Sequence, residues 1–362
     1  MAMLKSKQDK KVEKGKESAD VSNVVKSPMG KSIGIDLGTA NLLVYVEGEG
    51  VVINEPSVIA FDYETNEVIA VGQLAADMVG KGHQGIRIVS PLNQGVISDM
   101  EATKKLIEIS LRKAENLNLD ISQSTLLLCC PSEVTQLERE SFTSLGDRLG
   151  VKDIFIEQEV KAGAIGSGLD IFSSNGSMII DIGGGSTDIG VLSLGDIVVS
   201  ESNRIAGNYL DNEIINYLQY HHGLLIGKRT AERIKMEIGS LKEDLPNPRT
   251  TYASGRDVVT GLPKKITISE DEIRDVLTIP FESIANLVLK VLQKTPAELS
   301  ADIIVNGIII SGGGALVDGA DEFFHKRIGM DFSVSKRPLT AVVEGTKLLL
   351  KNRGSYFVKP TD

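Results

Sequence analysis

Residues 32–41 read SIGIDLGTAN, and the apolar run Leu42–Val46 follows them directly. Two apolar, β-branched runs joined by a short turn with Gly and Asn predict a β-hairpin. The same pattern returns at Met178–Ile180, which leads into DIGGGSTD at residues 181–188 and then into Ile189–Leu192. Because one unusual hairpin occurs twice, we expect two related lobes that face each other.

Both hairpins carry residue types suited to phosphate binding. Glycines let backbone N–H groups approach an anion closely, and neighbouring hydroxyls add donors. An Asp at a strand end would repel phosphate directly, but it can bind Mg²⁺ through the waters that this ion usually keeps. We therefore predict that Asp36 and Asp181 hold Mg²⁺ through water. Either hairpin alone could be a plain Gly-rich turn, and their repetition favours a phosphate clamp. The predicted nucleotide contacts in the hairpins are Gly38, Thr39, Ala40, Asn41, Gly183, Gly184, Gly185 and Ser186.

Two further segments are candidates for nucleotide contacts. The buried-strand run Ile308–Ile310 is followed by SGGGAL at residues 311–316 and by a predicted helix near Val317–Arg327, an arrangement that lets a ligand approach the backbone. Glu232 and Lys235 are three residues apart and share a helix face, so they could form an exposed ion pair or hold the edge of a purine and its ribose. The predicted contacts here are Glu232, Arg233, Lys235, Gly312, Gly313, Gly314, Ala315 and Leu316.

Composition excludes several classes of protein. The net charge of −10 argues against broad nucleic-acid binding, and we predict no nucleic-acid partner. No apolar run reaches the roughly 18–20 residues of a membrane span. The two cysteines, Cys129 and Cys130, are adjacent and end an apolar run, so we expect buried, reduced thiols and a cytoplasmic protein. The four histidines show no zinc-type spacing, and His221 and His222 are expected to end a helix.

The charge is unevenly distributed. Residues 1–31 hold eight lysines and four acidic residues, so this tail carries +4 and the rest of the chain −14. The tail has no hydrophobic periodicity, and we predict that it is disordered. It could be a solvated leader or a polybasic arm for an anionic membrane surface.

Taken together, these segments resemble the actin/sugar-kinase/heat-shock-chaperone ATPase superfamily. Within it, the chain resembles the MreB family of bacterial actins, in order and spacing, from about Ser32 to about Leu350. The motifs that carry this resemblance are GIDLGTAN, NEPSVIAFD, PLNQGVISD, RTAERIKMEIG, VTGLPKKITI, KTPAELSADII and SGGGAL.

The resemblance implies an α/β, actin-like two-lobed fold, in which duplicated sheet-and-helix domains with two smaller inserted subdomains surround a nucleotide cleft. It implies ATP and Mg²⁺ as cofactors, slow ATP hydrolysis, and head-to-tail filaments, commonly paired antiparallel, at the inner membrane face. Such filaments control cell shape or motility. The implied subdomains are IA (32–59, 101–171 and 345–362), IB (60–100), IIA (172–207 and 272–344) and IIB (208–271).

In the family, a Glu and a Thr position the water that attacks ATP, and they align with Glu159 and Ser186. Both neighbourhoods depart from the family pattern. Glu-Pro-Met becomes Glu159-Val160-Lys161, and loss of the proline loosens the backbone there. Lys161 would place a cation near the water site or pair with Glu159. Ser186 keeps the hydroxyl but lacks the β-branch of Thr. We therefore expect the protein to hydrolyse ATP still, at an altered and slow rate. Asn208, where the family tends to have Asp, is a smaller departure.

Membrane contact has two candidate elements. One is the basic tail with its apolar tip, Met1, Met3 and Leu4. The other is the loop that contains Leu117, Leu119 and Ile121, unless these side chains pack against the domain.

Three other members of the superfamily were considered. The segment between Val58 and Pro91 is short for the sugar-binding lobe of a sugar kinase, and no substrate-binding domain of a chaperone follows the ATPase region. A plasmid-segregating actin is the nearest alternative.

Overall fold

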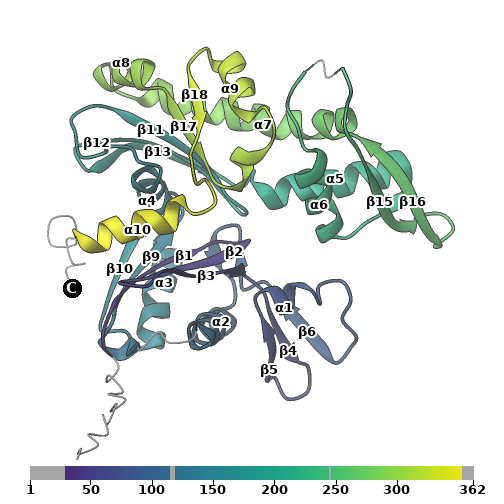
Figure 1. Ribbon diagram of the computed structural model, residues 1–362, viewed down its shortest axis with the longest axis horizontal. Helices are drawn as coiled ribbons and strands as arrows, with labels where there is room; N and C mark the ends of the chain where they lie inside the picture. Colours follow the sequence, from purple (N-terminus) through teal and green to yellow (C-terminus); the bar gives the residue numbers. More distant parts are fainter. Residues whose placement is uncertain (1–28, 115–118, 244–245, 353–362) are drawn as a thin grey trace, which may run out of the picture.

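The computed structural model describes residues 29–114, 119–243 and 246–352. Almost all of the predicted basic tail, and Leu117, therefore lie outside the described residues. The chain forms an upper and a lower lobe that meet on the left of Figure 1 and extend separately to the right.

Each lobe is built on a five-stranded sheet, and the two sheets have the same topology. In the lower sheet the order is β10 (Asp153–Gln158), β9 (Thr125–Cys130), β1 (Ser32–Leu37), β2 (Asn41–Val46) and β3 (Gly50–Pro56). In the upper sheet the order is β18 (Phe332–Val334), β17 (Ile308–Ser311), β11 (Ser177–Ile182), β12 (Thr187–Ser193) and β13 (Asp196–Asn203). In both sheets the central strand, β1 or β11, pairs antiparallel with the next strand of the chain, β2 or β12. On its other side it pairs parallel with β9 or β17. The predicted duplicated hairpins are thus β1–β2 and β11–β12.

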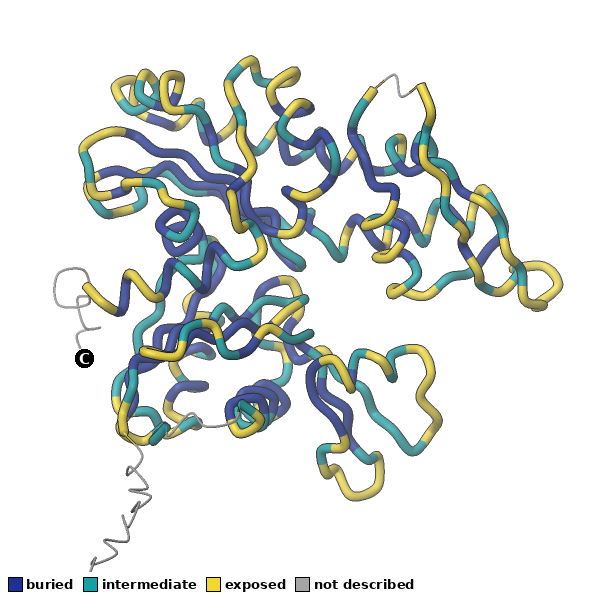
Figure 2. The backbone as a smooth tube through the Cα atoms, in the orientation of Figure 1, coloured by how far each residue is buried: buried dark blue, intermediate teal, exposed yellow. Residues whose placement is uncertain are grey.

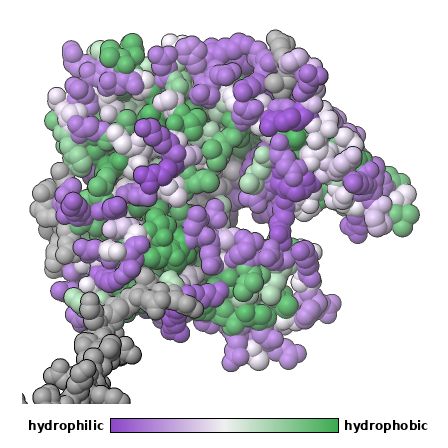
Figure 3. All heavy atoms as spheres, viewed as in Figure 1, coloured by the Kyte–Doolittle hydropathy of each residue, from purple (hydrophilic) through white to green (hydrophobic). Residues whose placement is uncertain are grey.

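A smaller sheet extends from each lobe on the right of Figure 1. Below are β4 (Ile59–Asp62), β5 (Val68–Val71) and β6 (Ile86–Val89), with the short helix α1 (Gln73–Ala76). Above are β14 (Leu224–Leu225), β15 (Thr250–Asp257) and β16 (Pro263–Ser269). A two-stranded ladder, β7 (Leu92–Asn93) and β8 (Val96–Ile97), lies near the cleft side of the lower lobe. In Figure 3 a small hydrophobic group marks the tip of the β15–β16 hairpin, where Val259 and Leu262 are exposed. The residue limits of the four subdomains stay a prediction.

Helices cover the outer faces of the sheets. The lower lobe has α2 (Met100–Lys113), α3 (Gln136–Leu149) and the 3₁₀ turn η1 (Ile121–Gln123). The upper lobe has α5 (Gly207–His222), α6 (Lys228–Ile238), α7 (Glu270–Lys294), α8 (Ala297–Asn306), α9 (Ala320–Ile328) and the 3₁₀ turn η2 (Gly313–Leu316). The buried side chains form one apolar core in each lobe (Figure 2). Within the described residues, no helix has both the length and the apolar character needed to cross a membrane.

Two helices, α4 (Glu159–Gly166) and α10 (Ala341–Lys351), lie between the large sheets and share an apolar cluster with strands of both (Figure 1). They pack closely because two glycines leave room for backbone contact. A Cβ atom on Gly166 would lie 1.7 Å from the carbonyl oxygen of Ala341, and one on Gly345 would lie 1.8 Å from that of Ala162. Neither approach is possible for a larger residue.

Several smaller expectations can be compared with the fold. Cys129 and Cys130 are buried, and His221 and His222 end α5, as predicted. Leu119 and Ile121 pack against the apolar core of the lower lobe, so the packing alternative is correct for these two side chains.

Candidate functional site

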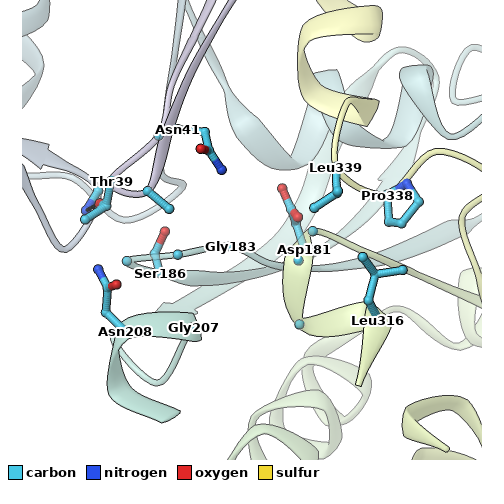
Figure 4. A pocket seen from close by; sticks show the side chains of 18 of the residues that line it. Thr39, Asn41, Asp181, Gly183, Ser186, Gly207, Asn208, Leu316, Pro338 and Leu339 are labelled. Carbon is cyan, nitrogen blue, oxygen red and sulfur yellow. Dashed lines mark hydrogen bonds between the residues drawn. The ribbon is translucent and has the colours of Figure 1, made fainter. Parts of the chain in front are cut away.

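A cavity of about 420 Å³ lies where the two lobes meet, between the predicted hairpins. The turn of β1–β2 forms one wall and the turn of β11–β12 forms the opposite wall. Figure 4 shows Thr39 and Asn41 on one side, Ser186 on the other, and the Asp181 side chain directed into the space. The cavity is lined by Asp36, Gly38, Thr39, Ala40, Asn41, Leu43, Gly95, Glu159, Asp181, Gly183, Gly184, Gly185, Ser186, Gly207, Asn208, Asp211, Glu232, Lys235, Met236, Gly312, Gly313, Gly314, Leu316, Val317, Pro338, Leu339 and Val342.

The hairpin turns approach each other so closely that glycine is needed at the contact. A Cβ atom on Gly184 would lie 2.6 Å from the Cβ atom of Ala40, and one on Gly185 would lie 2.2 Å from Thr39 Oγ1. Thr39 Oγ1 also accepts a hydrogen bond of 2.7 Å from the backbone N–H of Gly95, in the β7–β8 turn. The arrangement leaves two turns rich in backbone N–H groups on facing sides of one space.

The second hairpin is held by the start of α5. The backbone N–H of Gly207 donates to the carbonyl oxygen of Gly183 at 2.9 Å, and that of Asn208 donates to Gly184 at 2.8 Å. The Asn208 side chain therefore lies beside the cavity (Figure 4).

Asp36, Asp181 and Glu159 place acidic side chains on the cavity wall, and their charges act on one another. Burial raises the pKa of Asp36 to about 7. Burial, and then the charges of Asp36 and Asp188, raise the pKa of Asp181 well above its usual range. Such mutual repulsion in a buried site is relieved by a cation. Among the described residues no three His, Cys, Asp or Glu side chains are grouped to ligate a metal directly. Asp36 and Asp181 thus fit a hydrated Mg²⁺, which takes one or two carboxylates and keeps its other waters.

Glu159 is the first residue of α4 and lines the same cavity. Burial, and then the charges of Asp188, Asp36 and Asp181, raise its pKa well above the usual range. Asp188 is a functional candidate that the sequence reading quoted but did not assign. Burial raises its pKa, while hydrogen bonds from Ser132 and from the side chains of Ser186 and Ser202 oppose that shift.

Of the two alternatives for Lys161, the pair with Glu159 is wrong. The Lys161 ammonium lies 3.2 Å from Glu157 Oε2 and 3.8 Å from Asp196 Oδ1. Lys161 and Glu159 are two residues apart on α4, so their side chains leave the helix in different directions.

The other end of the cavity is more apolar. Lys235 Nζ lies 2.8 Å from Asp211 Oδ1 and donates to the carbonyl oxygen of Gly207 at 3.0 Å. Glu232 lines the cavity as well. Lys235 pairs with Asp211, and no ion pair between Glu232 and Lys235 occurs among the described residues. Leu316, Pro338 and Leu339 face this end (Figure 4), and Met236 completes it.

Two predicted contact residues lie outside the cavity wall. Arg233 donates to Glu237 Oε2 on the same helix at 2.5 Å and to the carbonyl oxygen of Tyr252 in β15 at 2.5 Å. Ala315 is buried and does not line the cavity.

A family model described as MreB/Mbl protein matches residues 30–356. The chain belongs to the MreB/Mbl family. It is 42% identical over 322 residues to the cell shape-determining protein Mbl of Bacillus subtilis (strain 168), which covers 89% of this chain and 96% of that protein. It is 38% identical over 317 residues to the cell shape-determining protein MreB of Escherichia coli (strain K12), which covers 86% and 91%.

Solved structures agree with this assignment to the MreB/Mbl family. The crystal structure of MreB5 of Spiroplasma citri bound to AMPPNP is 44% identical, covers 90% of this chain and 97% of its own, and has a TM-score of 0.85. A double helical filament of MamK is 20% identical and covers 89% and 98%, with a TM-score of 0.75, which shows the fold alone. The predicted actin-like fold and family are confirmed.

The MreB/Mbl motifs thus bring nearly all of the predicted site residues together. Several lining residues were not predicted from the sequence, among them Pro338, Leu339, Met236 and Asp211. Only Asp211 had a usable signal, because it follows Gly207 by one helical turn on the same predicted helix.

Proposed function

We propose that this MreB/Mbl-family chain binds ATP with Mg²⁺ in the cavity between its lobes, hydrolyses it slowly, and polymerises head to tail. The observation that carries the proposal is the pair of glycine-rich turns, one from each lobe, that face each other across buried carboxylates. The MreB5 relatives are described as bound to AMPPNP and to ADP, which supports a nucleotide at this position.

Backbone N–H groups of Gly38–Asn41 and Gly183–Ser186 would bind the phosphates, while Lys235 and Glu232 would contact the ribose and base. Asp36 and Asp181 would hold Mg²⁺ through water, and the ion would neutralise charge on the transferring phosphoryl group. Glu159 would orient the attacking water, with the Ser186 hydroxyl beside it. The raised pKa of Glu159 reflects a carboxyl group whose charge is costly until a cation is close.

A nucleotide that contacts both lobes can bias their closure and therefore assembly. A contact that repeats head to tail without closing a ring generates a filament. The named role of the relatives, cell shape determination, supports a cytoskeletal function in shape or motility. Antiparallel pairing of filaments, and a peripheral position at the inner membrane face through the basic tail of residues 1–31, belong to the same proposal.

The test compares wild type with Glu159→Ala in two assays on one sample, phosphate release and light scattering after addition of ATP and Mg²⁺. We expect wild type to release phosphate slowly and to scatter more light as it assembles, and the variant to lose phosphate release. Unchanged turnover in Glu159→Ala would remove Glu159 from the mechanism. Absence of ATP binding by wild type would contradict the proposed function as a whole. For the membrane, pelleting with anionic liposomes is expected to fall when residues 1–31 are removed, and equal pelleting would exclude the tail.

A further inference from the structure

Glu159 lies at the junction between β10 and α4. The carboxylate of Glu157 contacts a group before Glu159 and a group after it. Glu157, near the end of β10, accepts a hydrogen bond of 3.0 Å at Oε1 from the backbone N–H of Gln158. Its other oxygen, Oε2, lies 3.2 Å from Nζ of Lys161, on the first turn of α4. Glu159 therefore lies in the chain between Gln158 and Lys161, the two residues that Glu157 contacts.

This ion pair differs from a surface pair because both partners are withdrawn from water. The Lys161 side chain is 8% exposed and that of Glu157 is 14% exposed. A buried ammonium is costly unless it is paired in a fixed geometry. The pair therefore restricts the conformation of residues 157–161 more than a solvated i,i+4 contact would.

The start of α4 lacks two restraints that are common at the start of a helix. Gln158 occupies the position before the helix without a side-chain capping bond. The residue after Glu159 is Val160, which leaves the backbone free of the fixed φ that proline imposes. The Glu157–Lys161 pair supplies a restraint at the same place.

A third carboxylate connects this junction to the upper lobe. Asp196 begins β13, and its Oδ1 atom lies 3.8 Å from Lys161 Nζ. Glu157 belongs to the lower sheet, and α4 lies between the two sheets (Figure 1). Lys161 therefore contacts one carboxylate from each lobe, Glu157 of the lower sheet and Asp196 of the upper sheet.

We propose that Lys161 is a positioning residue for the ATPase reaction. Its bond to Glu157 fixes the first turn of α4 and so directs Glu159 into the cavity, and its contact with Asp196 connects the same turn to β13 of the upper lobe. The inference rests on the proposed function of the cavity and names residues outside its wall.

The first test is Asp196→Asn, because this side chain is 85% exposed and its removal leaves no buried charge unpaired. The expected result is a kcat for phosphate release about two- to fivefold lower, with an unchanged KM for ATP and an unchanged thermal unfolding midpoint. Asp196→Glu is expected to restore kcat. Asp331→Asn is the matched control, since Asp331 is an 88% exposed acid on the same lobe in an equally loose ion contact, with His325 at 3.5 Å, and its kcat is expected to stay at the wild-type value.

The second test replaces the buried pair by apolar side chains of similar size, Glu157→Leu with Lys161→Met, which preserves stability more often than removal of one partner does. We expect kcat to fall about tenfold or more while the affinity for AMPPNP stays at the wild-type value. A wild-type kcat in both Asp196→Asn and the double variant would overturn the proposal. A wild-type protein that binds ATP but releases no phosphate would instead overturn the proposed ATPase.

Discussion

The close packing of α4 on α10 predicts that Gly→Ala has opposite effects on stability at Gly166 and at Gly163, two positions of α4. In Gly166→Ala the new methyl group would lie 1.7 Å from the carbonyl oxygen of Ala341 and 2.9 Å from the backbone nitrogen of Gly345. In Gly163→Ala the nearest atoms are apolar side-chain carbons at 3.6 Å, an ordinary van der Waals distance.

The size of both effects follows from these distances. Replacement of a helical Gly by Ala gains about 1 kcal/mol from backbone entropy. Gly163→Ala should therefore be neutral or more stable by up to about 1 kcal/mol. At Gly166 the clash is with backbone, so the two helices must separate, and overpacking of this kind costs about 1–3 kcal/mol or more. The gain of about 1 kcal/mol offsets part of this cost, and the 1.7 Å clash favours its upper end, so we expect Gly166→Ala to lose about 2 kcal/mol or more of unfolding free energy.

Urea unfolding followed by circular dichroism measures both variants against wild type. Gly345→Ala provides an internal check, because its methyl group would lie 1.8 Å from the carbonyl oxygen of Ala162 and the same helix separation relieves both clashes. The double variant Gly166→Ala with Gly345→Ala should cost less than the sum of the single variants. Equal stability of Gly163→Ala and Gly166→Ala would refute the description of how the lobes are joined.

Three further predictions concern the site, pH and the thiols. Gly185→Ala places a methyl group 2.2 Å from Thr39 Oγ1 and should weaken ATP binding at least fivefold in isothermal titration calorimetry, so an unchanged affinity would argue against the hairpin clamp. Hydrogen bonds from Arg249 lower the pKa of Glu270 from 4.5 to about 2, so this pair should stabilise the fold by about 1–2 kcal/mol above pH 4.5 and lose that contribution as pH falls toward 2. The stability difference between wild type and Glu270→Gln should vanish over that window in thermal unfolding, and a difference that persisted at low pH would contradict the assignment. Burial raises the pKa of the Cys130 thiol to about 12, so iodoacetamide at pH 8 should label the protein only after unfolding, and labelling of the folded chain would show that the strand is accessible.

Much of the site could be predicted because its residues lie in short contiguous motifs. The turns at Gly38–Asn41 and Gly183–Ser186 combine glycine, hydroxyl and carboxylate in a way that few other turns need, and their repetition indicated two facing lobes. Adjacent residues of a helix point in directions about 100° apart. Helical periodicity therefore places Arg233 on a different face of the helix from Glu232 and Lys235. Arg233 accordingly faces β15 and not the cavity.

The contacts that the sequence did not predict are made between distant segments. Pro338 and Leu339 reach the cavity only because β18 and α10 bring their loop beside η2. Lys235 binds Asp211 because α6 packs on α5, and no spacing along the chain encodes that approach. For Lys161, the helix period predicts neither partner, because Glu157 lies in strand β10 and Asp196 comes from the other lobe.

Cryo-electron microscopy of the full chain with AMPPNP and Mg²⁺ tests the central claim most directly. We predict filaments in which the phosphates of AMPPNP lie between Gly38–Asn41 and Gly183–Ser186, with a Mg²⁺ ion joined to Asp36 and Asp181 through water. A nucleotide bound elsewhere, or filaments whose cavity holds no AMPPNP at saturating concentration, would contradict it.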